Sequence, residues 1–566
     1  MVVISRTNKD NYFYNNESSI RLVGLGCISG GLTTFVIMSI VYHSFYSCSI
    51  GGHPHKIVSY EDIPKHRDSS FIRGASDLAN LNFRAEIPRD VLGDDEYEEG
   101  DHDRLEGGGR GGEDDKFANK GRMPMDEVIS FMNHFISNLH QTFAGQQKKE
   151  YDAIWKIYHD YALEVLYPWD REYLERMPPL RNDNSLFLSL ASYRDENCMN
   201  TLKWAYEKAK NPHLLNVGLV QQNCEENCRS GKINDSELTE PINPDDDCHR
   251  IFCESPIGRE HCNAGRVRAL HINESESLGP YAARYFGSKL WDGEEYYVQM
   301  DAHMTFMQDW DDITIQSLKM APSEKPILSH YPPNHTADLE ENKHKGLVNR
   351  LCGAYFADSG LEDQIIRLGG DAGDAFGPYS DVPRFAPFAG AGFFVASSAF
   401  LKEVPYDPFL PWIFMGEEII MSARLWTSGY DIFSPRISVV GHIYLRLNKP
   451  KFWESVERLF HTGIHTPLQL LVLQRIKAQI IYPESTPDLV KPKTVLSHVD
   501  KYSMGTERKL EDYFKMVGLD MVNKQFIHRD MDWCYKGAVA PGYEKYSHLY
   551  PSENYNTDYL LPEDFI

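Results

Sequence analysis

The pattern of apolar and polar positions changes character along the chain. Residues 22–42 (LVGLGCISGGLTTFVIMSIVY) are 21 positions without a charge, the length of a helix that crosses a bilayer. A polar tract follows, and from residue 124 to 166 apolar side chains recur at the helical spacing of three and four. From residue 185 onward, short apolar runs alternate with amphipathic segments. The pattern predicts an anchor, a linker, a helical neck and an α/β domain.

Within the α/β part, the apolar runs at 186–191, 214–222 and 296–300 are typical of buried strands. Amphipathic segments at 199–211 and 279–293 predict the helices between them. This alternation predicts a Rossmann-like, mostly parallel sheet with helices on both faces. Ligands of such sheets bind at the carboxyl ends of the strands.

The N-terminal segment predicts the topology. Arg6, Lys9 and Arg21 precede the apolar span, whereas Lys56 is the only Lys or Arg in the fifteen residues after it. The positive-inside rule then places the N-terminus in the cytosol and the rest in a lumen. A cleaved signal peptide is the alternative, but its apolar region usually has only about 7–15 residues. We expect a single-pass type II protein of the Golgi or endoplasmic reticulum membrane.

These patterns divide the chain into six expected regions. The tract before the neck is a flexible stalk, because Gly-rich, acidic sequence such as EGGGRGGEDD buries too little surface to fold. The neck either packs on the following domain or forms a dimerising stalk. The expected regions are the cytoplasmic tail (1–21), the transmembrane anchor (22–42), the acidic stalk (43–123), the helical neck (124–184), the α/β catalytic domain (185–482) and a C-terminal extension (483–566).

Charge excludes one class of partner. The chain has 58 basic and 82 acidic residues and a formal net charge of −24. A nucleic-acid partner needs a concentrated basic surface, so none is expected. A nucleotide ligand held by a local site and a metal ion remains compatible with this charge.

The cysteines and glycosylation motifs agree with a lumenal location. The sequons at Asn234, Asn273 and Asn334 would be usable there. Disulfides are the expected use of cysteine in an oxidising compartment. Zinc bound with His249 and His261 is the alternative, although C-x3-C and C-x4-C differ from the compact pairs of zinc modules. Five cysteines form one cluster. Because five is an odd number, at least one cysteine of the cluster pairs outside it or stays free, and Cys198 and Cys352 are the candidate partners. The cluster consists of Cys224, Cys228, Cys248, Cys253 and Cys262.

The strand at 296–300 ends on Asp301-Ala302-His303. In extended backbone, residues i and i+2 project to the same side, so Asp301 and His303 can converge. A carboxylate and an imidazole are part of a ligand set for a divalent cation such as Mn²⁺. The third candidate ligand is His442, which ends the apolar run in RISVVGHIYLR. Alternatively, these histidines are structural.

Another polar turn is expected at the same edge of the sheet. Ser192, Tyr193, Arg194 and Asp195 follow the first strand of the domain. Because the carboxyl ends of parallel strands meet at one edge, this turn and the Asp-x-His motif form one candidate site.

A second group of candidates lies on a helix between Gly416 and Gly429. Glu417 and Glu418 occupy its first turn, where the helix dipole favours ionised carboxylates. They are about 100° apart around the axis, so only one can point squarely into a cleft. Both could simply complement the dipole.

Two glycines and an arginine complete the candidates. Gly390 and Gly392 precede an expected strand and permit close backbone approach to a ligand, or form a turn. Arg284 could present a guanidinium fork to phosphate, or make an ordinary surface pair.

Three blocks of sequence together resemble a known family. They are SLASYRDENCMNTL (189–202), GPYAARYFGSKLWDGEEYYVQMDAHMTF (279–306) and the segment 390–435 that contains MGEE. In this order they resemble the GT-A glycosyltransferases that attach α-linked N-acetylglucosamine to protein hydroxyls, and most closely the hydroxyproline- and threonine-directed enzymes of protists. The polypeptide N-acetylgalactosaminyltransferases are more distantly similar. The resemblance covers about residues 185–450; the insertion before Arg284 is longer than expected, and the tail after 483 matches nothing.

The resemblance implies a GT-A fold and a role for each candidate. Asp301, His303 and His442 would hold Mn²⁺ against the diphosphate of a UDP-sugar. The turn at 192–195 would lie near the uridine, and Arg284 near the nucleotide-sugar. Glu417 would contact the sugar, with Glu418 beside it, as the catalytic carboxylates. Gly390 and Gly392 fall in the acceptor-side block.

The resemblance also implies an activity. It would be transfer of N-acetylglucosamine from UDP-N-acetylglucosamine to hydroxyproline, threonine or serine of a protein acceptor, with retention of anomeric configuration. A metal and an arginine can stabilise the charge that develops on departing UDP, so no strong general base is required. The alternatives are a transferase that uses another UDP-sugar and a non-catalytic lumenal carbohydrate-binding protein of the same fold.

Overall fold

The computed structural model describes most of the chain after residue 120. The described residues are 121–144, 150–226, 228, 243–340, 348–357, 365–369, 375–377, 382–446, 449–452, 465–483 and 485–550. The chain divides into two units, 1–95 and 96–566, and all described residues belong to the second. The predicted membrane span at 22–42, the stalk sequence before residue 121 and the sequon at Asn234 lie outside them. Over the described ranges, no helix combines the length and the apolar character that a bilayer span requires.

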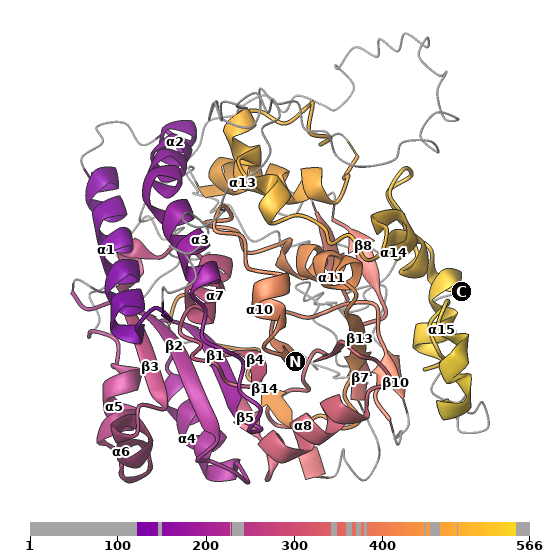
Figure 1. The fold of residues 1–566 in the computed structure, drawn as a ribbon, viewed down its shortest axis with the longest axis horizontal. Helices are drawn as coiled ribbons and strands as arrows, with labels where there is room; N and C mark the ends of the chain where they lie inside the picture. The colour runs from indigo at the N-terminus through magenta and orange to yellow at the C-terminus, as the bar shows by residue number, and fades with distance from the viewer. Residues whose placement is uncertain are drawn as a thin grey trace, which may run out of the picture. The chain divides into compact units, whose positions relative to one another are not determined.

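A large mixed sheet forms the centre of the fold (Figure 1). Neighbouring strands pair in parallel except around β12 and β11, which run against their neighbours. The expectation of an α/β fold with a mostly parallel sheet is therefore confirmed. In spatial order the eight strands are β11 (Arg384–Phe385), β13 (Asp431–Ser434), β6 (Pro326–Ser329), β12 (Phe393–Ser397), β4 (Tyr296–Asp301), β1 (Leu186–Tyr193), β2 (Leu215–Asn223) and β3 (Val267–Asn273).

The central strands are apolar on both faces because helices cover both faces. Leu188 and Leu190 of β1 join a buried cluster with Leu202 of α4 (Cys198–Lys208). Ser189, which points the other way, lies against α7 (Pro280–Ser288), where a Cβ added at Gly287 would come within 2.9 Å of the Ser189 hydroxyl oxygen. Strands covered on both sides read as continuous apolar runs, which is the pattern seen at 186–191 and 296–300.

The remaining helices of this half follow the same logic. α5 (Cys248–Glu254) packs on β2, and α6 (Pro256–Asn263) packs on α5 and β3. The described ranges of the domain also contain α8 (Trp310–Met320), α10 (Phe400–Glu403), α11 (Glu417–Thr427) and a 3-10 turn at Glu274–Glu276.

Small two-stranded ribbons project from the domain. In one of them, β5 (Met304–Phe306), which follows β4 along the chain, pairs with β14 (Val440–His442). The other ribbons in the described ranges pair β7 (Val348–Arg350) with β10 (Ala375–Gly377), β8 (Ala354–Phe356) with β9 (Ile366–Leu368), and β15 (Leu519–Asp520) with β16 (Gln525–Phe526).

The neck forms helices that pack on the sheet domain. α1 (Met125–Ala144) lies against β3, and its Phe135 ring contacts Phe286 of α7. Phe131 stacks on Trp169 with ring centroids 4.2 Å apart. The apolar stripe predicted from the spacing of these residues is thus buried within the chain itself. The other neck helices are α2 (Tyr151–Tyr161), a π-helical turn (Ala162–Leu166) and α3 (Tyr167–Glu175).

Four disulfides connect described cysteines, which confirms the expectation of disulfides. Cys198 pairs with Cys248, so one member of the cluster does pair outside it. The other three bonds are Cys224–Cys228, Cys253–Cys262 and Cys352–Cys534.

The C-terminal part, for which the sequence suggested no role, covers the end of the sheet. Figure 1 shows α14 next to α11, and α15 next to β10. Phe385 of the edge strand β11 packs against Tyr543, Tyr546 and Tyr550. An uncovered edge strand would be open to pairing with another chain, and this layer removes that exposure. Its elements are α14 (Leu510–Met516), α15 (Asp532–Tyr535) and 3-10 turns at Lys493–Leu496, Val499–Lys501, His528–Met531 and Glu544–Leu549. α13 (His465–Gln479) precedes them, at the end of the range predicted as the catalytic domain.

A buried ion pair fastens this C-terminal part to the sheet domain. Arg475 Nε on α13 lies 2.6 Å from Asp407 Oδ2, and their side chains are 0% and 1% exposed. The same guanidinium donates to the carbonyls of Val495 and Ser497 at 2.9 and 2.8 Å. One cation therefore joins three segments that are distant in sequence.

Replacing Arg475 by Met should destabilise the protein by about 3–5 kcal/mol, because Asp407 would remain buried without its counter-charge. The free energy of unfolding in urea measures this. The control is Lys536→Met, which removes an exposed pair with Asp532, with side chains 51% and 54% exposed. That change should cost about 0–1 kcal/mol. Equal losses for both variants would contradict the assigned role of Arg475.

Candidate active site

Asp301 and His303 lie together at the carboxyl end of β4. Asp301 is the last residue of the strand and pairs in register with Ala191 of β1, so the ends of the two strands meet. Ala302 turns into the core and is 0% exposed. Asp301 Oδ2 and His303 Nε2 are 3.9 Å apart. Both side chains therefore lie on one side, as expected, although residues 302 and 303 form a bend between β4 and β5 and not the extended backbone from which this was predicted.

A ribbon returns His442 to the same place. β14 pairs antiparallel with β5, which sets His442 opposite Met304, and the Ile443 amide donates to the His303 carbonyl at 3.0 Å. His442 Nε2 is 3.0 Å from Asp301 Oδ2, and the two imidazole centroids are 4.6 Å apart. Gly441 is needed here, because an added Cβ would lie 2.7 Å from Thr305 Oγ1 and 3.0 Å from the Cα of His335.

The three side chains suit a divalent cation. One donor atom from each of Asp301, His303 and His442 lies within 4.8 Å of the others. Burial alone would raise the pKa of Asp301, but His442, His303 and Arg284 hold it well below its usual range. Burial lowers the pKa of His442, which favours the neutral imidazole that binds metals. Gly392 leaves room beside the carboxylate, since a Cβ there would stand 3.3 Å from Asp301 Oδ2.

Asp195 orients one of these histidines. Its Oδ2 lies 2.6 Å from His303 Nδ1, and its side chain is 1% exposed. Arg446 Nη1 donates to the same oxygen at 2.7 Å. Burial raises the pKa of Asp195, but His303 and Arg446 lower it below its usual value. When a carboxylate accepts from Nδ1–H, Nε2 is left free to bind a metal. A carboxylate is a common hydrogen-bond partner of metal-bound histidine.

Arg284 links two of the predicted site residues to each other. Its Nη2 donates to Asp301 Oδ1 at 3.0 Å, and its Nη1 binds Glu417 Oε2. Burial lowers the pKa of Arg284, but Glu417 and Asp301 raise it above its ordinary value, so it remains a cation. The pair is buried, with side chains 10% and 4% exposed, and is therefore not the surface pair considered as an alternative.

Glu417 and Glu418 point to different partners, as their angular separation predicts. α11 begins after Gly416, whose φ of +94° suits a residue without a side chain. Glu417 Oε1 accepts from Gln299 at 3.4 Å, whereas Glu418 accepts from the Tyr331 hydroxyl at 2.7 Å. Burial raises the pKa of both carboxyls. Both glutamates therefore do more than complement a helix dipole.

The two predicted glycines lie close to other groups of the site. The Ala391 amide between them donates to Glu418 Oε1 at 2.9 Å. An added Cβ at Gly390 would approach the Tyr331 ring to 2.9 Å. The loop before β12 therefore follows the site closely because it has no side chains at these positions.

The segment 192–195 is divided between two environments, and its first two residues, Ser192 and Tyr193, belong to β1 itself, which ends two residues later than the apolar run predicts. Asp195 reaches the histidines, but Arg194, with φ of +46°, is fully buried between Asp245 and Glu274 at 2.8 Å each. Ser192 is 1% exposed, and the Tyr193 ring meets Phe452 edge-on. Arg194 thus holds the turn in place through its carboxylate partners.

The sequence did not indicate three participating residues: Arg446, Tyr331 and Gln299. Gln299 sits inside the apolar run of β4 and donates to the Ala391 carbonyl at 2.8 Å. A polar residue within a buried strand was a usable signal, since buried amides are normally hydrogen-bonded. Arg446 and Tyr331 lie in segments with no distinctive pattern.

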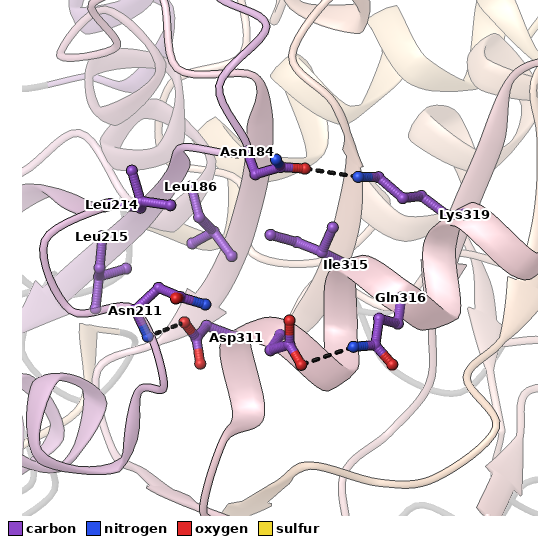
Figure 2. Close-up of a pocket in the computed structure, with 10 residues that line it drawn as sticks. Asn184, Leu186, Asn211, Leu214, Leu215, Asp311, Ile315, Gln316 and Lys319 are labelled. Atoms are coloured by element: carbon purple, nitrogen blue, oxygen red, sulfur yellow. Dashed lines mark hydrogen bonds between the residues drawn. The ribbon is translucent and has the colours of Figure 1, made fainter.

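A hollow of about 290 Å³ lies at the amino ends of the strands, opposite the candidate site (Figure 2). It opens at the amino ends of β1 and β2, away from the carboxyl ends that carry Asp301 and Asp195. Its polar groups bond to one another: the Asn211 amide donates to Asp311 at 2.9 Å, and Lys319 donates to Asn184 at 2.6 Å. The convergent polar groups expected of an active site are found at the other edge. The lining residues are Asn184, Leu186, Asn211, Leu214, Leu215, Asp311, Asp312, Ile315, Gln316 and Lys319.

Comparison with known proteins relates this site to a family. The family model described as Glycosyltransferase (GlcNAc) matches residues 185–523, which include every residue of the candidate site. A solved structure described as "Crystal structure of GalNAc-T7 with UDP, GalNAc and Mn2+" is similar at 14% identity and a TM-score of 0.34, over 58% of this chain and 56% of that one. The chain therefore spans about half the length of that structure. No curated protein matches this chain.

Changing Asp195 to Asn should weaken Mn²⁺ binding roughly 10–100-fold, because the amide no longer fixes the His303 ring and its tautomer. Titration of the purified protein with Mn²⁺, followed by its electron paramagnetic resonance signal, measures the affinity. The matched control is Asp312→Asn in the distant hollow, which should bind Mn²⁺ as the wild type does. An Asp195→Asn protein with undiminished affinity would remove this carboxylate from the centre.

Proposed function

The chain belongs to the Glycosyltransferase (GlcNAc) family, and from that membership we propose that it transfers N-acetylglucosamine from UDP-N-acetylglucosamine to a protein hydroxyl group, with Mn²⁺ as cofactor and a GT-A catalytic domain. The observation that supports the proposal best is the convergence of Asp301, His303 and His442 at the carboxyl edge of a mostly parallel sheet. This is the edge at which such sheets bind nucleotides.

In this proposal the three side chains hold the cation, and the surrounding charges keep them in place. When bound, Mn²⁺ would neutralise the diphosphate and stabilise the charge that develops on departing UDP. Asp195 fixes the ring of His303 through the 2.6 Å contact, and Arg446 fixes Asp195. Ligands held in advance need no rearrangement during the reaction.

Arg284 would contribute a second positive charge next to that of the bound Mn²⁺ ion. It is bound to Asp301, so its guanidinium stands one hydrogen bond from the metal-binding carboxylate. A fixed cation in a site of low dielectric favours the negative charge of the leaving group. The pairing with Glu417 holds the guanidinium in this orientation.

The glutamates and the glycine loop would position the two substrates. We assign Glu417 to the side of the donor sugar, next to Arg284, and Glu418, with Tyr331 and the loop of Gly390 and Gly392, to the side of the acceptor. The turn at 192–195 would border the uridine. Retention requires the hydroxyl to arrive on the face that UDP leaves, and positioning of this kind can supply much of the rate enhancement.

The purified full-length protein should release UDP from UDP-N-acetylglucosamine and glycosylate hydroxyproline-, threonine- or serine-containing peptides with Mn²⁺, but not with a chelator. His303→Ala should lower the rate roughly 100-fold or more, since it removes one of the three proposed ligands of the cation that would stabilise the leaving group. Chromatography of UDP and mass spectrometry of the peptide provide the measurement.

His213→Ala, at an exposed position, is the control for the histidine change and should retain full activity. Unchanged turnover in chelator would reject the metal. Transfer only from another UDP-sugar would reject the donor, and sugar binding without nucleotide or metal dependence would reject the enzyme.

We also propose the type II topology, with the catalytic domain in the lumen, on the basis of the uncharged span at 22–42 and the arginine and lysine residues before it. In sealed microsomes, added protease should leave the chain after the span intact and should digest it once detergent is present. Digestion of the catalytic domain in sealed vesicles would reverse the topology.

A further inference from the structure

One disulfide differs from the others in its exposure. Cys253–Cys262 joins α5 to α6, and both residues are partly exposed. The six cysteines of the other three disulfides between described residues are all buried, with at most 4% exposure. Exposed disulfides are the ones that reductants reach first. Cys253–Cys262 is thus the bond in the described part of the chain that a reductant should open most readily.

Two histidines stand beside this bond. His249 lies one helical turn before Cys253 on α5, and a ring nitrogen of His249 is within 4.8 Å of both sulfur atoms. His271, on the edge strand β3, brings its Nε2 to 3.3 Å from His249 Nδ1. Gln221 lies 3.3 Å from the other nitrogen of His271 and accepts from the backbone amide of His249 at 3.0 Å.

Three of the possible ligands, His249, Cys253 and Cys262, already lie within 4.8 Å of one another. His271 is not part of that group, but one of its nitrogens stands at a ligand-to-ligand distance from His249. Zinc bound by cysteine and histidine has Zn–N bonds of about 2.0–2.1 Å, and a tetrahedron then separates two nitrogens by about 3.4 Å. The His249 and His271 nitrogens are 3.3 Å apart.

We propose that, after reduction of the Cys253–Cys262 disulfide, Cys253, Cys262, His249 and His271 bind one Zn²⁺ ion. The four residues follow the spacing H-x3-C-x8-C-x8-H. The site is separate from the Asp301 centre, which contains no thiol. His261, the histidine that the sequence suggested, is not a ligand here: its ring stacks on Tyr206 at 4.0 Å and accepts from Arg266 at 2.8 Å.

The redox step balances with a dithiol as reductant. The dithiol gives two electrons and two protons, closes into its own disulfide, and leaves Cys253 and Cys262 as thiols. Zn²⁺ then displaces both thiol protons. Two thiolates and two neutral imidazoles cancel the charge of the ion. The metal would connect α5, α6 and β3, so the reduced form would keep the cross-link of the oxidised form and extend it to the sheet edge.

The full-length chain tests this with Co²⁺ as a spectroscopic substitute for Zn²⁺. Mild treatment with a phosphine breaks the disulfide, with water supplying the phosphine oxide oxygen and the two thiol protons. After removal of the phosphine without oxygen, added Co²⁺ should produce a thiolate-to-cobalt charge-transfer band that saturates and that disappears with Zn²⁺. The oxidised protein should not show the band, and the Asp301 centre cannot produce it.

Variants identify the ligands. The double change Cys253→Ser with Cys262→Ser should abolish the band, and His249→Ala or His271→Ala should weaken Co²⁺ binding about tenfold or more. His213→Ala changes an exposed histidine outside the proposed site, and this variant should bind Co²⁺ as the wild type does. Circular dichroism checks that each variant is folded. A band that persists in the double variant, or undiminished affinity in either histidine variant, overturns the ligand set.

A second readout needs no variant. Alkylation of the reduced wild-type chain, followed by peptide mass mapping, should label Cys253 and Cys262 before the other disulfide cysteines, and Zn²⁺ should suppress that labelling. Earlier opening of another disulfide, or labelling that Zn²⁺ leaves unchanged, overturns the proposal.

Discussion

The carboxylate of Asp301 holds the candidate site together. One oxygen faces the imidazoles of His442 and His303, and the other accepts from Arg284, which in turn binds Glu417. The carboxylate can contact all of these partners because Asp301 is the last residue of a central strand. Its position is fixed by the pairing of β4 with β1 on one side and β12 on the other.

The electrostatic balance of this cluster favours a cation. Asp195, Asp301 and Glu417 contribute three carboxyl groups, whereas Arg284 and Arg446 contribute two guanidinium groups. Burial of unbalanced negative charge is costly, and burial raises the pKa of Glu417 accordingly. A divalent ion between Asp301 and the two histidines would offset that cost. The same burial makes the site a region of low dielectric, where fixed charges would act strongly on the diphosphate of the proposed donor.

The rest of the chain supports this edge of the sheet. The ribbon of β5 and β14 positions His442, and the glycine at 441 allows the backbone of His335 to lie against it. At the edge strand β11, the tyrosines at 543, 546 and 550 pack on Phe385. The Cys352–Cys534 disulfide attaches this C-terminal layer to the domain. The cysteine-bearing helices α5 and α6 pack beside β2 and β3, at a distance along the sheet from the candidate ligands Asp301, His303 and His442.

The sequence by itself determined the features that depend on local periodicity. The apolar runs predicted β1, β2 and β4, the spacing of Val128 to Leu139 predicted α1, and the glycines at 416 and 429 delimited α11. The sequence also predicted that Asp301 and His303 project to one side, although a bend at residues 302 and 303 brings them together in the structure. Tertiary structure decided which groups meet: Asp195 with His303, Arg284 with Glu417, Arg446 with Asp195, and Cys198 with Cys248. These contacts join segments from different strands and loops, and their partners depend on strand order and register, which no local pattern encodes.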